Sequence, residues 1–182
     1  FSLIFNSYNK QLSLNPLSVI NFEDSVSFGS LSILKIYVSL NINNFNFKDS
    51  LAIAIIREYS DIIEYSLMYP FFQQYHFLSE DIIDLLKLTI YKKKTDYFNY
   101  FIERLGNQII VDWYSKEPED SLLNFACTFG NVKAAKIIID LIIKSSPKTN
   151  CTTPFLNAAI RGYEEICQYM IDKNVVLLFY NE

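Results

Sequence analysis

The stretch TPFLNAAIRGYEEICQYMI, Thr153 to Ile171, decides the fold. Pro154 suits the first turn of a helix, where its missing N–H has no partner to lose, and the hydroxyls of Thr152 and Thr153 are candidate N-caps. Gly162 can take the left-handed conformation that ends a helix and reverses the chain. The stretch therefore predicts two short helices around a tight turn. The second helix carries the apolar period of a buried stripe, made by Ile166, Cys167, Met170 and Ile171.

The same pattern occurs 32 residues earlier, in SLLNFACTFGNVKAAKIII from Ser121 to Ile139. The small pair Ala158–Ala159 falls on Ala126–Cys127, and Gly162 falls on Gly130. Weaker copies with the same order of features occur around Gly29, Glu58 and Lys93. We call the turn residues pivots, and they are Gly29, Glu58, Lys93, Gly130 and Gly162. A hairpin of this size cannot bury its apolar faces alone, so neighbouring units are expected to stack.

The last two units resemble ankyrin repeats, whose pattern is T-P-L-H-x-A-A-x-x-G followed by an apolar second helix. The resemblance is good over Ser121–Asn174 and weaker over about residues 20–108. It implies an all-α, ankyrin-type helix-turn-helix repeat solenoid of about five stacked repeats, forming one domain over residues 1–182. The matching residues are Thr153, Pro154, Phe155, Ala158, Ala159 and Gly162, with Ala126 and Gly130 in the preceding unit.

Departures from the ankyrin pattern affect the expected geometry. Leu156 stands where the family has histidine, so the hydroxyl–imidazole link between neighbouring units is absent. Glu58 and Lys93 are pivots without glycine, which implies either a left-handed non-glycine residue or a longer turn. Steps of 35 and 37 residues between pivots suggest longer loops around Pro70–Ser79 and Gly106–Pro118. Other solenoids of helical pairs stay open for the N-terminal half.

Composition excludes several classes of function. Of 182 residues, 51% are apolar and 20% charged, and the net charge of -4 is of the wrong sign for a dedicated nucleic-acid binder. No apolar run reaches the roughly 20 residues that a membrane span needs. The chain begins with Phe1, which suggests a fragment or processed product. The N-terminus has no basic region ahead of an apolar run, so a signal peptide is not supported, although a missing start could hide one. We expect a cytoplasmic protein, with a secreted effector or the intracellular part of a larger protein as alternatives.

No constellation of residues indicates catalysis. His76, the single histidine, lies in an aromatic loop, and neither a phosphate-binding loop nor a zinc motif occurs. Cys127 and Cys167 fall on the predicted buried stripe, whereas Cys151 is expected in a loop as the exposed thiol. We therefore expect no enzymatic activity, no cofactor and no metal site. An unrecognised enzyme that uses His76 or Cys151 is the weakest hypothesis. The run Lys92–Lys94 is expected to be a solvated turn.

The resemblance to ankyrin repeats implies a concave surface for binding another protein, and the chain is expected to be a monomer. A structural repeat segment of a larger multidomain protein, with its activity outside this chain, is the alternative function. Phe28 and Phe129 have a competing interpretation as packing residues between units. The predicted binding positions precede each pivot, with two more in a hairpin loop: Ser27, Phe28, Ile56, Arg57, Tyr91, Lys92, Thr128, Phe129, Ile160, Arg161, Thr149 and Asn150. Thr152, Glu117, Pro118 and Asp120 would flank them.

Overall fold

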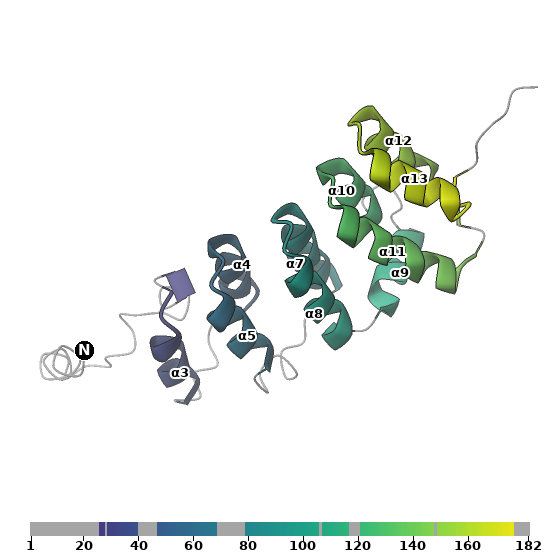
Figure 1. The fold of residues 1–182 in the computed structure, drawn as a ribbon. Coiled ribbons are helices and arrows are strands. Elements are labelled where there is room, and N and C mark those ends of the chain that lie inside the picture. The colour runs from purple at the N-terminus through teal and green to yellow at the C-terminus, as the bar shows by residue number, and fades with distance from the viewer. Residues whose placement is uncertain are drawn as a thin grey trace, which may run out of the picture. The chain divides into compact units, whose positions relative to one another are not determined.

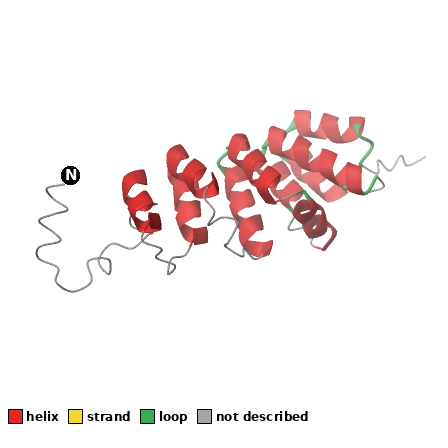
Figure 2. Ribbon diagram, turned by 90° about the horizontal axis from the view of Figure 1, so that it is seen from below, coloured by secondary structure: helices red, strands yellow, loops and turns green. Residues whose placement is uncertain are grey.

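The computed structural model describes residues 26–27, 29–39, 47–68, 79–105, 107–116, 121–147 and 149–176. These ranges are helical and contain no strand, so the predicted all-α class is confirmed (Figure 2). Within the same ranges, no helix has both the length and the apolar character that a membrane crossing requires. The helices are α3 (Leu31–Ser39), α4 (Phe47–Arg57), α5 (Ser60–Met68), α7 (Ser79–Tyr91), α8 (Thr95–Leu105), α9 (Gln108–Lys116), α10 (Leu122–Phe129), α11 (Val132–Ser145), α12 (Thr152–Ile160) and α13 (Glu164–Asp172).

The chain divides into two compact units, Phe1–His76 and Phe77–Glu182. In the first unit, α4 and α5 pack as a helical hairpin, and α3 packs against α5. In the second unit, α7–α8, α10–α11 and α12–α13 form successive hairpins (Figure 1). Their first helices, α7, α10 and α12, lie side by side as one layer, and their second helices, α8, α11 and α13, form the other.

All five predicted pivots adopt the left-handed conformation. The φ angles are 67° at Gly29, 61° at Glu58, 55° at Lys93, 64° at Gly130 and 75° at Gly162. Of the two alternatives for a pivot without glycine, the left-handed residue is therefore correct for Glu58 and Lys93. An L side chain in this conformation costs about 1–2 kcal/mol, which the surrounding packing must offset at these two turns.

One backbone hydrogen bond recurs at four of these turns. The N–H of the residue after the pivot donates to the carbonyl five positions earlier, at 2.9–3.0 Å, which is the bond that closes a Schellman motif. Each accepting carbonyl belongs to a small residue with no exposed surface, because the two helices of the hairpin approach closely there. The pairs are Tyr59 with Ala54, Lys94 with Thr89, Asn131 with Ala126, and Tyr163 with Ala158.

The residue after a pivot also contacts the turn of the preceding repeat. The ring of Tyr59 lies over Gly29 and that of Tyr163 over Gly130, so closely that a Cβ on either glycine would lie 2.8 Å or 2.4 Å from a ring carbon. Asn131 makes a polar version of this contact: its Nδ2 donates to the carbonyl of Ile90 at 3.0 Å. These contacts connect neighbouring turns without the histidine of the ankyrin pattern.

A helix replaces the long loop expected around Gly106–Pro118. Gln108–Lys116 forms α9, which packs against α10 and α11. Ile110 and Tyr114, one turn apart, are its buried residues, and the Tyr114 hydroxyl donates to the carbonyl of Asn150 at 2.9 Å. The extra residues of this step therefore build an additional packed helix. Of the other expected loop, Ser79 is the first residue of α7, and residues 70–78 lie outside the described ranges.

Three local expectations around the last hairpin are wrong. Cys151 is fully buried rather than exposed, because its N–H donates to the carbonyl of Val175 at 2.8 Å and Tyr114 covers its thiol. Burial raises the pKa of the Cys151 thiol, so it is a weak nucleophile. Neither threonine hydroxyl caps α12, since the N–H of Thr152 donates to Oδ1 of Asn150 at 3.0 Å. Ile171, expected in the buried stripe, is 37% exposed.

Cys127 and Cys167 differ although both were expected on the buried stripe. Cys127 is fully buried, as predicted, and burial raises the pKa of its thiol. Cys167 is only half-buried. The residues that correspond to them, 32 positions away, show the same difference: Ala135, which corresponds to Cys167, is fully buried, whereas Ala159, which corresponds to Cys127, is exposed. The difference in burial therefore follows the hairpin rather than the position within it.

Candidate partner-binding surface

Six of the predicted binding residues lie at the C-terminal ends of the first helices in the second unit. We call them the pivot patch: Tyr91, Lys92, Thr128, Phe129, Ile160 and Arg161. They fall at one end of one layer because each pair precedes a pivot and α7, α10 and α12 pack side by side. Ile160 is 79% exposed and Tyr91 54% exposed, which are large values for side chains of this size and polarity.

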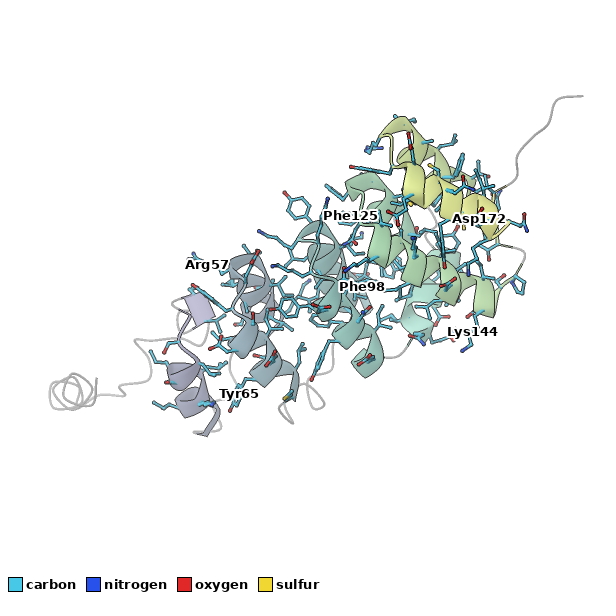
Figure 3. The ribbon with its side chains drawn as sticks, in the orientation of Figure 1. Arg57, Tyr65, Phe98, Phe125, Lys144 and Asp172 are labelled. Atoms are coloured by element: carbon cyan, nitrogen blue, oxygen red, sulfur yellow. The ribbon has the colours of Figure 1, made fainter. Side chains whose placement is uncertain are left out.

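Three aromatic rings pack together at the pivot patch: Tyr91 and Phe129 belong to it, and Phe125 contacts Phe129. The Tyr91 and Phe129 ring centroids lie 5.2 Å apart with perpendicular planes, and Phe125, labelled on α10 in Figure 3, lies 4.5 Å from Phe129. Phe129 therefore packs against a residue of the neighbouring hairpin, as its competing interpretation held. The same contact fixes the position of the Tyr91 ring, whose outer surface faces solvent.

Leu156 extends the apolar surface of α12, which the sequence reasoning did not anticipate. Leu156 and Ile160 are one turn apart and 51% and 79% exposed, whereas Pro154 and Ala158 of the same helix are buried. The i, i+4 spacing of Leu156 and Ile160, opposite the small-residue stripe, was the available signal. The ankyrin pattern identifies Leu156 only as the residue at the histidine position, and its exposure makes it an additional candidate contact residue.

Two cations belong to the pivot patch. Lys92 follows Tyr91 at the end of α7, and Arg161 follows Ile160 at the end of α12. The Nη1 of Arg161 donates to the carbonyl of Asn157 at 3.2 Å and lies 3.4 Å from its Oδ1. These contacts hold the exposed guanidinium at the C-terminal end of α12, where positive charge is favourable. The pivot patch thus combines apolar rings and isoleucine with positive charge.

Thr149 and Asn150 are not brought to the pivot patch. They precede α12, whose nine residues separate them from Ile160 by about 13 Å along the helix axis. Both make local contacts. The Thr149 hydroxyl donates to the carbonyl of Ser146. Asn150 accepts from the Thr152 N–H through Oδ1 and from the Tyr114 hydroxyl through its carbonyl. Their role in binding stays a prediction, and the structure gives both a role in holding the loop.

In the first unit, Ile56 is 48% exposed and Arg57 projects from the end of α4 (Figure 3). Ser27 is half-buried, and its carbonyl lies 3.5 Å from the Tyr59 hydroxyl. Phe28, His76, Glu117, Pro118 and Asp120 lie outside the described residues. Among the residues that are described, no group of three or more His, Cys, Asp or Glu could hold a metal ion.

On the layer of second helices, unlike in the pivot patch, charged side chains of neighbouring hairpins form ion pairs with one another. Lys136 of α11 pairs with Glu165 of α13 at 2.7 Å. Asp140, one turn further, accepts from Lys173 at 2.7 Å and from the Tyr169 hydroxyl at 2.8 Å. Exposed pairs of this kind add little stability, but they pair these charges within the layer. The layer of first helices is therefore the better candidate for contact with a partner.

A scan against protein-family models, a search of curated proteins and a search of solved structures each gave no match to this chain. The functional assignment accordingly follows from the residues and geometry of the surface.

Proposed function

We propose that the chain is an ankyrin-type repeat protein that binds another protein through the pivot patch. Two observations support the repeat assignment. Left-handed residues recur at all five pivots, and a buried small residue lies four positions before four of them. In the second unit, successive hairpins also order their first and second helices into separate layers.

The exposure of Ile160 beside Arg161 is the observation that carries the binding function. Burying an isoleucine side chain is worth about 1.5–3 kcal/mol, and Ile160 leaves 79% of its surface in water. Tyr91, held in place by Phe129, adds an exposed aromatic ring on the same layer. Tyrosine and arginine are enriched among the residues that dominate binding energy at protein interfaces. A partner that covers these side chains gains this free energy.

The charges of the pivot patch define the chemistry of the partner. The chain as a whole has a net charge of -4, yet both charged residues of the pivot patch, Lys92 and Arg161, are cations. The complementary partner segment is apolar with flanking carboxylates. Its binding weakens as ionic strength rises, because the Debye length falls from about 10 Å at 0.1 M salt to about 3 Å at 1 M.

Affinity purification with matched variants tests this function. Ile160→Asp with Arg161→Glu alters two exposed side chains, so the helical circular dichroism stays unchanged. The unfolding midpoint falls slightly, because both substitutions place negative charge at the C-terminal end of α12. The control is Lys144→Glu, an exposed charge reversal near the end of α11 (Figure 3). We expect the double variant to lose specific partners by about tenfold or more, equivalent to about 1.4 kcal/mol of binding, while the control retains them. Equal recovery by wild type, double variant and control would refute the pivot patch as the binding site.

A further inference from the structure

The last hairpin exposes an apolar face that the preceding hairpin buries. Four positions of α10–α11, Leu123, Cys127, Ala135 and Ile139, have no exposed surface. Shifted by 32 residues, they correspond to Phe155, Ala159, Cys167 and Ile171 of α12–α13. Phe155 and Cys167 are half-buried, and Ala159 and Ile171 are exposed. We call these four residues and Gly162 the end face.

The covering hairpin accounts for this difference. α12 packs against α10, and α13 packs against α11, so the α10–α11 face is covered by the hairpin that follows it in sequence. In the same way, α10 packs against α7 and α11 against α8. Each hairpin of the second unit is thus covered by its successor, and the end face is the corresponding surface of the last described hairpin.

The surroundings of Gly162 independently indicate that the last hairpin lacks a covering neighbour. Gly29 and Gly130 each lie beneath the tyrosine that follows the next pivot, Tyr59 and Tyr163. Gly162 has the same left-handed conformation, with φ 75°, but no atom of the described residues comes within 4 Å of where its Cβ would be. The space that a tyrosine ring occupies at the other two glycine pivots is open at Gly162.

Polar groups at the edge of the end face also match those of an interface between hairpins. Lys136 of α11 pairs with Glu165 of α13, and Asp140 of α11 pairs with Lys173, which directly follows α13. The corresponding residues of α13 are Gln168 and Asp172, and Gln168 donates to Asp172 at 2.8 Å within the helix. Asp172 therefore occupies the position from which Asp140 binds a lysine of the next hairpin.

We propose that the end face binds one further helical hairpin of the same kind, following α13 in the polypeptide, with an aromatic ring over Gly162. The continuity of the stack identifies this occupant, because every covered hairpin of the second unit is covered by its successor in sequence. This inference does not depend on the proposed binding function, since the end face and the pivot patch share no residue.

The test adds a second copy of residues 149–176, carrying Cys151→Ala and Cys167→Ala, directly after Val176 of the chain. Its Tyr163 is then available to cover Gly162. Labelling of the original Cys167 by a thiol reagent reports coverage, because Cys127 and Cys151 are buried. Burial raises the pKa of Cys167, so labelling is done at mildly alkaline pH. We expect the added hairpin to slow labelling by about tenfold or more. An unchanged rate in the extended protein would overturn the proposal.

Ile171→Glu in the original hairpin is the variant that tests contact between the end face and the added hairpin. The exposed Ile171 tolerates the change without the added hairpin, with little effect on the unfolding midpoint, whereas the variant restores fast labelling of the extended protein. Gly162→Ala provides a second measurement, because the new methyl group would meet the added tyrosine ring. It lowers the unfolding midpoint more in the extended than in the unextended protein. Equal effects of each substitution in the two proteins would contradict stacking of the added hairpin.

Two further results identify a different occupant, and each overturns the proposal. Labelling of Cys167 in the unextended chain that slows as protein concentration rises indicates a second copy on the end face. Labelling that accelerates when residues 177–182 are removed indicates that the chain's own C-terminal segment covers it. The proposal expects neither effect.

Discussion

The turns at Gly130 and Gly162 have the same backbone but different surroundings. Both glycines are left-handed, and after both the next residue donates to a buried alanine carbonyl five positions back. A tyrosine ring nevertheless fills the space above Gly130, whereas the space above Gly162 is open among the described residues. The local sequence therefore determines the conformation of the turn, and the neighbouring hairpin determines how strictly glycine is required there.

Substituting alanine for Gly130 and for Gly162 should separate the effect of the turn conformation from that of the neighbouring hairpin. We expect these two substitutions to show the largest difference in unfolding free energy. Gly162→Ala introduces only the left-handed strain and is expected to cost about 1 kcal/mol of unfolding free energy. Gly130→Ala adds displacement of the Tyr163 ring, for a total of about 3 kcal/mol. Urea denaturation measures both. Combining Gly130→Ala with Tyr163→Ala removes the steric part, so the two losses must be less than additive; equal costs at the two glycines would show that the ring does not constrain Gly130.

Substitution of Asn131 tests the hydrogen bond that joins its hairpin to the preceding one. Its Oδ1 caps α11 by accepting from Ala134, and its Nδ2 donates to Ile90 of the preceding hairpin. Ser121 is a matched control, because its hydroxyl caps α10 by accepting from Asn124. Asn131→Ala is expected to cost about 2 kcal/mol and Ser121→Ala about 1 kcal/mol in the same urea experiment. If Asn131→Ala costs no more than Ser121→Ala, the bond to Ile90 contributes nothing measurable.

Glycine at a non-glycine pivot should have the smallest effect and the opposite sign. Lys93 is left-handed at φ 55°, and Lys93→Gly relieves this strain while adding entropy to the unfolded chain. The net expectation is a gain of up to about 1 kcal/mol. Lys92→Gly, one residue earlier and outside the left-handed region, should instead lose about 0.5–1 kcal/mol. A loss from Lys93→Gly would mean that the Lys93 side chain contributes more than its strain costs.

The sequence predicted the surface less completely than the turns. Tyr91, Ile160 and Arg161 were correctly placed at the ends of first helices, because their distance from a pivot is a local property. Leu156 was missed as an exposed residue, and Thr149 and Asn150 lie at the other end of α12. The contact of Phe129 with Tyr91 joins residues 38 positions apart, which no local pattern encodes.

The sequence by itself determined the helical class and the five turn positions. These follow from apolar periodicity and from the few residues that tolerate a left-handed conformation, both of which act over a few neighbours. Only the tertiary structure decided that Gln108–Lys116 forms a packed helix and that Cys151 is buried beneath Tyr114. It also decided that Ile171 is exposed while Ile139, at the same repeat position, is buried. The physical reason is that burial depends on what packs against a residue from elsewhere in the chain, and hairpins of similar sequence have different neighbours.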